Sequence, residues 1–362
     1  MDKVGVGVIG CGRISGQYLE NLVRRFSFCL ETLACADLVP AHAEQRAQEF
    51  GIPHVCSVED LLGDPQVELV VNLTVPAAHF AVTMAALDAG KHVYTEKPLA
   101  VTREEGKRLV AKAKERGLLL GGAPDTFLGA GLQTCRKLID DGWVGTPITA
   151  QALIAMGVHV ERYHKLGVGP MFDMGPYYVT ALVALLGSVK RVSGSAQVPF
   201  ATKANPDPQS PDYARTYTVD TPTVVSGVLD FESGAVGVVT TTCEVLGYNP
   251  RLEVYGTEGI LTCNDPNMFG GGVYVQRRGG ERREVALTHY YSDRNRGLGV
   301  ADMAYAIRNG RAPRASGDLM YHVHDVMHGI HDASREERHV LLESRAQRPA
   351  PFPAGYTTPI FE

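Results

Sequence analysis

The chain has 362 residues and a formal net charge of −5, which is enough length for about two domains with sizeable cores. It has no basic patch of the kind that binds nucleic acid and no apolar run that approaches the length of a membrane span, so neither is an expected partner. The seven cysteines form no C-x-x-C pair, and the sequence enters its first predicted strand without room for a signal peptide. We therefore predict a soluble, cytoplasmic protein with reduced thiols.

The first predicted element is a β-branched strand at 4–9 that ends in a glycine turn, and an apolar pattern of helical spacing follows at once. Gly10 permits the sharp turn, and Gly12 lets the backbone approach a ligand without a Cβ in the way. A strand, a glycine turn and a helix in this order bind the pyrophosphate of a dinucleotide at the helix N-terminus. Ser15 is small enough for close helix–strand packing, and its hydroxyl is a candidate phosphate ligand. The predicted turn consists of Gly10, Gly12, Arg13, Ile14 and Ser15.

A second buried strand, at 32–36, ends in Asp37, which lies 25 residues after Gly12. This is close to the spacing at which a carboxylate meets the adenosine ribose hydroxyls. Leu38 follows, with no adjacent Arg or Lys to neutralise a 2′-phosphate, so NAD is favoured over NADP as cofactor. The alternative is a glycine turn of some other α/β protein, with Asp37 capping the next helix.

Strands continue to alternate with helices through the first third of the chain, which predicts a doubly wound parallel sheet over 1–124. Thr102 and Glu105 have the spacing of a capping box at the start of one of these helices. The further predicted strands are 54–57, 67–74, 92–95 and 118–120, and the helices are 77–89 and 102–116.

Strands without intervening helices dominate the remainder, which predicts an α+β domain over 125–362 with a large, mainly antiparallel open sheet. Two late helices, at 298–309 and 317–333, are expected to pack on this domain. The proline- and aspartate-rich stretch 204–212 is predicted to be an exposed loop. The predicted strands are 148–155, 192–198, 224–231, 235–243, 252–255, 273–277 and 284–287, and the earlier helices are 130–141 and 171–186.

Three ordered motifs identify a known family. The glycine turn, Glu96-Lys97-Pro98 after the fifth strand, and the segment 169–177 with Asp173 and Tyr177 together resemble the Gfo/Idh/MocA oxidoreductases over essentially the whole chain. The resemblance implies a Rossmann domain and a β-sheet domain that often mediates oligomerisation, here as a homodimer or homotetramer. It also implies hydride transfer between NAD(P) and a sugar- or cyclitol-like substrate.

Lys97 follows a parallel strand, where open α/β sheets place their ligands, and its ammonium can stabilise alkoxide character on a substrate hydroxyl. In similar proteins the Lys97–Pro98 bond is often cis. Many family members carry His at the position of Tyr177, whereas this chain resembles the glucose–fructose oxidoreductase branch in carrying Tyr there. We assign proton acceptance to Tyr177, with Lys97 lowering its pKa and Asp173 holding neighbouring hydroxyls. Exchanging the roles of Lys97 and Tyr177 is equally tenable, and Tyr177 as a core aromatic is a further alternative.

The resemblance also implies contacts for which local turns and polar surface loops are the alternatives. The implied cofactor contacts are Asn72, Thr74, Pro76, His79, Glu96 and Lys97. The implied substrate contacts are Asp125, His159, Tyr163 and His164. No metal is predicted, because the helically spaced His324, His328 and His331 have no acidic or cysteine partner in the sequence and relatives work without metal.

We therefore expect an NAD-dependent dehydrogenase that oxidises a secondary hydroxyl of a pyranose or an inositol. Few Arg or Lys residues lie near the Asp173 helix, which favours a neutral substrate over a sugar phosphate. Three alternatives stay open: glycoside elimination through transient ring oxidation, a non-catalytic NAD-binding sensor, and reduction of an aldehyde, imine or diketone.

Overall fold

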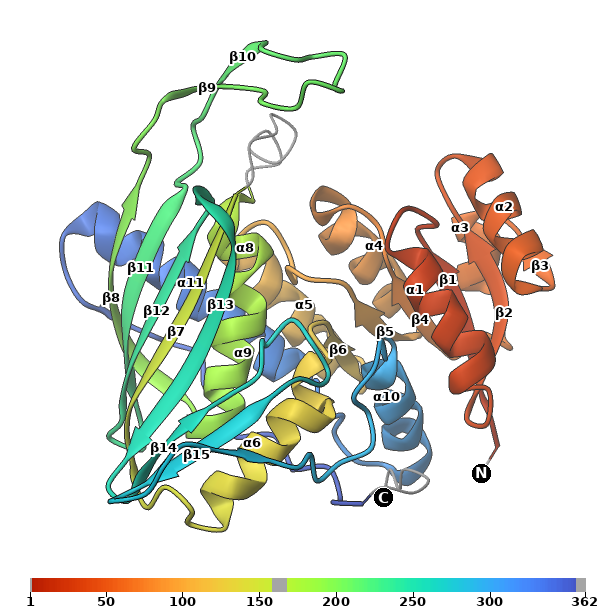
Figure 1. Cartoon of the computed structure of the whole chain (residues 1–362). Coiled ribbons are helices and arrows are strands. Elements are labelled where there is room, and N and C mark those ends of the chain that lie inside the picture. The colour runs from red at the N-terminus through yellow and green to blue at the C-terminus, as the bar shows by residue number, and fades with distance from the viewer. Residues whose placement is uncertain (1, 158–167, 356–362) are drawn as a thin grey trace. The chain divides into compact units, whose positions relative to one another are not determined.

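The computed structural model describes residues 2–157 and 168–355 (Figure 1). These residues form two compact units, each described separately below. The first unit contains residues 2–129, 290–321 and 352–355, and the second contains 130–289 and 322–351. The helix predicted at 298–309 was expected to pack on the second domain, whereas it groups with the first unit.

The first unit is built around a six-stranded parallel sheet of order β3-β2-β1-β4-β5-β6, which confirms the doubly wound fold. The chain order reverses between β1 and β4, and ligands of such sheets bind at this switch point, beyond the carboxyl ends of the strands. The strands are β1 (Val4–Ile9), β2 (Leu30–Ala36), β3 (His54–Val55), β4 (Leu69–Asn72), β5 (His92–Thr95) and β6 (Leu120–Gly122).

Helices connect these strands, and all six residues of β1 are buried, as expected for a central strand covered on both faces. The predicted capping box is confirmed, since the Glu105 amide donates to Thr102 Oγ1 over 3.2 Å and the Thr102 amide to Glu105 Oε2 over 3.0 Å. The helices are α1 (Ser15–Glu20) with a π-helical continuation (Asn21–Arg25), α2 (Pro40–Phe50), α3 (Val58–Gly63), α4 (Pro76–Asp88), α5 (Arg103–Glu115), a 3-10 turn (Thr126–Leu128) and α10 (Leu298–Asn309).

Helix α10 joins the first unit through side-chain contacts that span most of the sequence. Arg308 of α10 binds the Glu68 carboxylate with two hydrogen bonds of 2.6 Å each. Glu68 stands just before β4 and also accepts from the Gly5 amide. A bidentate pair of this kind fixes orientation as well as distance, which explains why α10 packs beside the parallel sheet.

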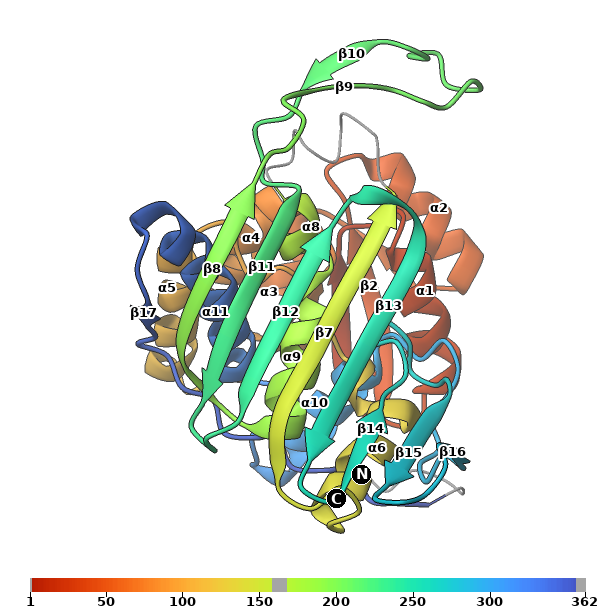
Figure 2. The same ribbon diagram turned by 60° about the vertical axis from the view of Figure 1, so that its left-hand side comes forward.

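The second unit contains a nine-stranded sheet of order β16-β15-β14-β13-β7-β12-β11-β8-β17 (Figure 2). The sheet is mainly antiparallel, as predicted, but β7 and β12 run parallel. A small hairpin extends from it and carries the predicted exposed stretch 204–212. The strands are β7 (Pro147–Gly157), β8 (Val189–Gln197), β9 (Thr202–Ala204), β10 (Thr216–Thr218), β11 (Val224–Phe231), β12 (Val236–Thr242), β13 (Glu244–Gly256), β14 (Gly259–Thr262), β15 (Val273–Arg277), β16 (Arg283–Val285) and β17 (Val340–Leu341).

Helices cover one face of this sheet and lie behind it in Figure 2. Paired glycines mark a close approach: a Cβ on Gly194 of β8 would lie 2.5 Å from the Ile330 carbonyl oxygen, and one on Gly227 of β11 2.6 Å from the Ile330 side chain. The helices are α6 (Ala130–Asp140), α8 (Gly169–Asp173), α9 (Gly175–Leu186) and α11 (Gly317–Glu336), of which the part from His322 onward belongs to this unit.

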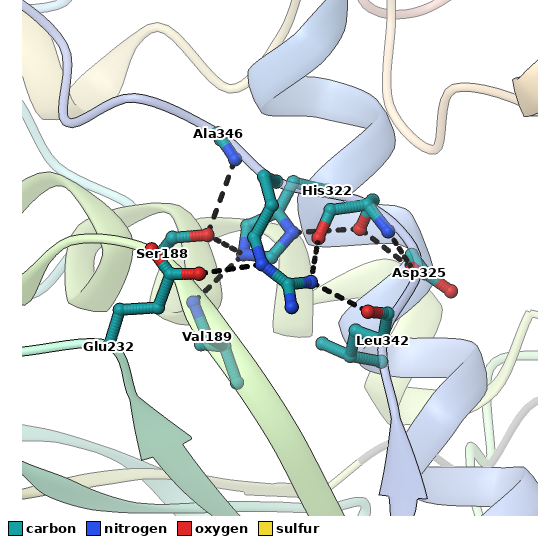
Figure 3. A network of polar contacts seen from close by, with 9 residues as sticks. Ser188, Val189, Glu232, His322, Asp325, Leu342 and Ala346 are labelled. Atoms are coloured by element: carbon teal, nitrogen blue, oxygen red, sulfur yellow. Dashed lines mark hydrogen bonds and ion pairs between the residues drawn. The ribbon is translucent and has the colours of Figure 1, made fainter. Parts of the chain in front are cut away.

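A buried polar network ties the segment after β17 to α11 and to the start of β8 (Figure 3). The Val189 amide donates to His322 Nε2 over 3.0 Å, so Nε2 carries no hydrogen and Nδ1 is the protonated ring nitrogen. His322 Nδ1 then donates to Ser344 Oγ at 2.8 Å, and Ser344 Oγ donates to Asp325 Oδ2 at 2.7 Å. Burial lowers the pKa of His322 to about 4. Ser188 is also buried in this network, so these residues serve the fold.

Candidate cofactor and catalytic sites

Glycine is needed at the two positions of the first turn for different physical reasons. Gly10 has a φ of +100°, and a Cβ there would lie 2.6 Å from the Leu73 backbone, so the fold itself requires glycine. A Cβ on Gly12 would meet nothing within 4 Å. The protein therefore leaves space at Gly12, as the close approach of a pyrophosphate requires, and the turn fits a dinucleotide.

Asp37 is fixed beside this turn at the end of β2. Its Oδ2 accepts from the Cys11 amide over 2.7 Å, and its Oδ1 accepts from the Val39 amide over 2.8 Å. His42 Nδ1 lies 3.4 Å from Oδ1. The next residue, Leu38, is 97% exposed, so an apolar surface stands beside the carboxylate. This arrangement suits an adenosine, with its ribose on the carboxylate and its base on the apolar side chain.

Arg46 is a cation of this region that the sequence analysis missed. Its Nε donates to Ser15 Oγ at 3.1 Å, and its Nη2 donates to the Gly12 carbonyl at 3.5 Å. Ser15 Oγ in turn donates to the same carbonyl at 2.6 Å and is fully buried, so the hydroxyl acts within the turn. Arg46 lies nine residues after Asp37 on α2, and only the packing of α2 beside α1 brings it to the turn.

Lys97 follows β5, and the bond between Lys97 and Pro98 is cis, as the resemblance implied. The neighbouring Glu96 is 7% exposed and points into the unit. Its Oε1 accepts from the Tyr18 hydroxyl over 2.7 Å, and its Oε2 accepts from the Lys97 amide over 3.0 Å. The Glu96 side chain therefore holds the backbone of Lys97 in this structure.

The turn after β4 is held by its own side chains. Asn72 Oδ1 accepts from Thr74 Oγ1 over 2.7 Å, and Asn72 Nδ2 donates to the His79 carbonyl over 3.1 Å. The His79 ring is buried between the Pro98 and Thr74 carbonyls. Thr74 and Pro76 are partly exposed, whereas Asn72 and His79 are buried. The exposed pair is thus placed to meet a ligand, and the buried pair shapes the turn.

Asp125, an implied substrate contact, is completely buried in the first unit. Its Oδ2 accepts from the amides of Gly297, over 2.8 Å, and Gly299, over 3.1 Å. Both amides stand at the N-terminus of α10, where a carboxylate is favoured by the helix dipole. Burial raises the pKa of Asp125 above its ordinary value. In this structure the carboxylate serves to attach α10.

Asp173 and Tyr177 lie in the second unit, on two helices rather than on one continuous helix. Asp173 ends α8, Tyr177 stands in the first turn of α9, and Met174 separates them with a φ of −106°. Pro176 explains the break, because it has no amide hydrogen to donate to the Phe172 carbonyl four residues earlier. Tyr177 is 5% exposed.

Tyr178, the residue after Tyr177, shares Asp265 with Tyr248, and the sequence did not predict this group. The Tyr178 hydroxyl donates to Asp265 Oδ1 over 3.1 Å, and the Tyr248 hydroxyl donates to Asp265 Oδ2 over 2.7 Å. Burial and the hydrogen bond to Asp265 raise the pKa of Tyr248 above its ordinary value, with a smaller contribution from Tyr177. No motif marks Tyr248 or Asp265, since β13 and the segment after β14 meet α9 only in the folded unit.

Phe172 is surrounded by three imidazoles of α11. The ring of His331 stacks on it at a centroid distance of 5.3 Å, and His328 and His324 lie at 4.7 and 6.2 Å. His324 Nε2 and His328 Nε2 are 3.1 Å apart. These histidines therefore pack around the residue that precedes Asp173. Among the described residues, no cluster of three or more His, Cys, Asp or Glu side chains is arranged to hold a metal ion.

Three further implied substrate contacts, His159, Tyr163 and His164, lie outside the described residues. Over the ranges that the structure describes, no helix has the length and apolarity needed to cross a bilayer.

The fold and these sites define a protein class, the oxidoreductases with an NAD-binding Rossmann fold. Residues 4–122 match the family described as "Oxidoreductase family, NAD-binding Rossmann fold", and residues 132–262 match the GFO/IDH/MocA C-terminal domain. The chain belongs to the Gfo/Idh/MocA family, as its three motifs predicted.

Curated relatives agree with this membership. The chain is 34% identical to 1,5-anhydro-D-fructose reductase of Ensifer adhaerens over 70% of its own length and 74% of the relative. It is 33% identical to inositol 2-dehydrogenase/D-chiro-inositol 3-dehydrogenase of Lactiplantibacillus plantarum, over 71% and 70%. Apo levoglucosan dehydrogenase has the same fold, with a TM-score of 0.83 at 20% identity over 96% of this chain and 100% of that one.

Proposed function

We propose that this oxidoreductase is an NAD-dependent dehydrogenase that acts on a secondary hydroxyl of a neutral sugar or cyclitol. The observation that carries the proposal is the space at Gly12, with Asp37 fixed at the end of β2 and Lys97 at the end of β5. The names of the relatives, an anhydrofructose reductase and inositol dehydrogenases, support the substrate class.

Each candidate residue has a proposed role that follows from its chemistry. The Gly12 turn and Asp37 would hold the dinucleotide, whose nicotinamide supplies the acceptor or donor of the hydride. The Lys97 ammonium would orient the reacting hydroxyl and stabilise negative charge on its oxygen. Tyr177 would accept the hydroxyl proton, and Asp173 would bind neighbouring hydroxyls. Lys97 as the proton acceptor is the alternative assignment.

The decisive test is a panel of pyranoses, inositols and their phosphates, assayed with NAD and NADP at the nicotinamide absorbance band. Turnover of an unphosphorylated polyol is the expected result. Tight NAD binding without turnover across the panel would contradict the proposal and favour a sensor. Cleavage of a glycoside without net reduction of NAD would instead identify transient ring oxidation.

The preference for NAD is a separate proposal with its own prediction. Asp37→Ser combined with Leu38→Arg should raise kcat/KM with NADP relative to NAD by about tenfold or more, since a repelling carboxylate is replaced by an attracting guanidinium. Arg46→Ala is the matched control, because loss of NADP use alone in that variant would show that Arg46 already serves a 2′-phosphate. An unaltered cofactor ratio in the double variant would show that Asp37 does not meet the ribose.

The cofactor turn supplies a further prediction. Gly12→Ala should raise the Kd for NAD by about tenfold or more at unchanged thermal stability, because the added methyl group meets no protein atom within 4 Å but would enter the space proposed for the pyrophosphate. Gly10→Ala is the control, and it should lower thermal stability because its Cβ meets the Leu73 backbone. Equal NAD affinity in Gly12→Ala and the wild type would exclude this turn as the pyrophosphate site.

We further propose a homodimer or homotetramer formed through the sheet of the second unit, in the cytoplasm. Val228 of β11 and Val238 of β12 are paired in register and 41% and 37% exposed, so they offer an apolar face to a second copy. All seven cysteines are free, which is compatible with a reducing compartment. Sedimentation velocity measures the assembly, and a monomer at micromolar concentration would contradict it.

A further inference from the structure

His79 makes two contacts that an ordinary neutral histidine does not make together. Its Nδ1 lies 2.7 Å from the Pro98 carbonyl oxygen, and its Nε2 lies 3.0 Å from the Thr74 carbonyl oxygen. A carbonyl oxygen only accepts hydrogen bonds, so each contact needs a hydrogen on the ring nitrogen. A neutral imidazole has one such hydrogen and an imidazolium has two. Both bonds therefore form at once only when the ring is protonated.

The two carbonyls belong to the two segments that carry candidate site residues of the first unit. Pro98 directly follows Lys97, and Thr74 is one of the partly exposed residues after β4. The ring is 1% exposed, so water does not compete for these contacts. Asn72 provides a second connection between Thr74 and His79, because its side chain accepts from the Thr74 hydroxyl and donates to the His79 carbonyl.

We propose that His79 is a positioning residue: its Nδ1 fixes the segment that carries Lys97, and its Nε2 fixes the turn at Thr74 that meets the dinucleotide. The family resemblance implied a cofactor contact for His79, whereas its burial between two carbonyls gives it this different role. The inference rests on the proposed dehydrogenase function for the meaning of the two segments. The pair of hydrogen bonds from His79 to Pro98 and Thr74, the His79 bridge, is itself a property of the fold.

Protonation completes the bridge. Burial lowers the pKa of His79 below its ordinary value, against the hydrogen bonds to Pro98 and Thr74, which raise it. Two charged neighbours act on the ring as well, since Glu96 raises its pKa and Lys97 lowers it. Because the pKa is lowered, the neutral ring with one hydrogen predominates at neutral and alkaline pH, and the fraction of rings that make both bonds grows as the pH falls into the acid range.

Two substitutions separate the two contacts. The amide nitrogen of asparagine in His79→Asn lies where Nδ1 lies and can keep the bond to Pro98, whereas that of glutamine in His79→Gln lies where Nε2 lies and can keep the bond to Thr74. His79→Asn should raise KM for NAD by about 3- to 10-fold with kcat nearly unchanged, the effect of one lost hydrogen bond. His79→Gln should lower kcat by about the same factor with KM for NAD nearly unchanged. Both differences from the wild type should be larger at pH 6 than at pH 8.

The matched control is His92→Asn. Leu119 donates its amide to His92 Nδ1 over 2.9 Å at the amino end of β5, away from the carboxyl ends where ligands bind. Asparagine oxygen can accept the same bond, so kcat and KM should not change. Equal changes of the same kinetic parameter in both His79 variants, or changes that follow thermal stability alone, would overturn the proposal.

Hydrogen exchange keeps this test independent of turnover. Amides at 97–101 should lose protection in His79→Gln, and amides at 73–78 should lose protection in His79→Asn. This crossed pattern in an enzyme that turns over no polyol would contradict the proposed function and leave the bridge intact. Equal loss of protection in both segments in both variants would contradict the bridge.

Discussion

Replacement of Lys97 by alanine is expected to lower kcat by about 100-fold or more, while the Kd for NAD stays within about threefold of the wild type. The ammonium at the end of β5 would stabilise negative charge that develops on the substrate oxygen, and removal of such a donor commonly costs about 2.7 to 4 kcal/mol of transition-state stabilisation. Steady-state kinetics on the polyol found in the substrate panel, with NAD titration of the same preparations, measures both quantities.

Lys114→Ala is the matched control for this loss. Lys114 lies on α5 of the same unit, is 66% exposed at its side chain and pairs with Asp318, so its removal should leave kcat unchanged. A kcat for Lys97→Ala equal to that of the control would remove Lys97 from the mechanism. A loss that appears in NAD affinity alone would make Lys97 a cofactor-binding residue.

The sequence correctly predicted those parts of the cofactor site whose residues are close together in the chain. The strand at 4–9, the turn at Gly10 and Gly12 and the helix after it form one continuous segment, and the structure has them in that order. Asp37 lies beside this turn because β2 pairs in parallel with β1, so both strands end at the same edge of the sheet. Local pattern is sufficient here, since each element begins where the previous one ends.

The direction in which a side chain points was not readable from the chain. Glu96 and Asp125 follow predicted strands, and His79 lies in the first turns of the helix predicted after the strand at 67–74, so all three are near the carboxyl ends of strands, where ligand contacts are expected. All three are buried and bind groups of the protein itself. Asp125 meets Gly297, which is 172 residues away, so the reason for its burial lies in a segment that no local pattern connects to it.

Strand lengths in the second unit illustrate the same limit. The sequence predicted a strand at 252–255, whereas β13 runs from Glu244 to Gly256. The missing half is largely exposed and carries Leu246, Gly247 and Pro250, so it lacks the alternation that marks a half-buried strand. Pairing with β7 holds it in the sheet, and that pairing is a tertiary contact. Tyr248, which shares Asp265 with Tyr178, was overlooked for this reason.

Acid should destabilise the second unit through His322. The pKa of His322 is lowered to about 4 in the folded state, whereas an exposed histidine in the unfolded chain has a pKa of about 6.5. Between these two pH values the unfolded chain therefore binds a proton that the folded protein does not. The free energy of unfolding is therefore unaffected by the protonation of His322 above about pH 6.5, and it decreases as the pH falls from 6.5 toward 4. Between pH 7 and pH 4 the wild type should lose about 3 kcal/mol more free energy of unfolding than His322→Gln, which does not titrate.

The Figure 3 network gives the structural reason and the design of this test. Protonated Nε2 can no longer accept from the Val189 amide, so the charged ring loses a bond as well as solvation. The glutamine oxygen can accept from the same amide at every pH. Other buried histidines add to the acid loss of both proteins, so the difference between the two denaturation curves isolates His322. His54→Gln, at an exposed position, should retain the wild-type pH dependence, and an acid loss in His322→Gln equal to that of the wild type would show that His322 already accepts its proton in the folded state.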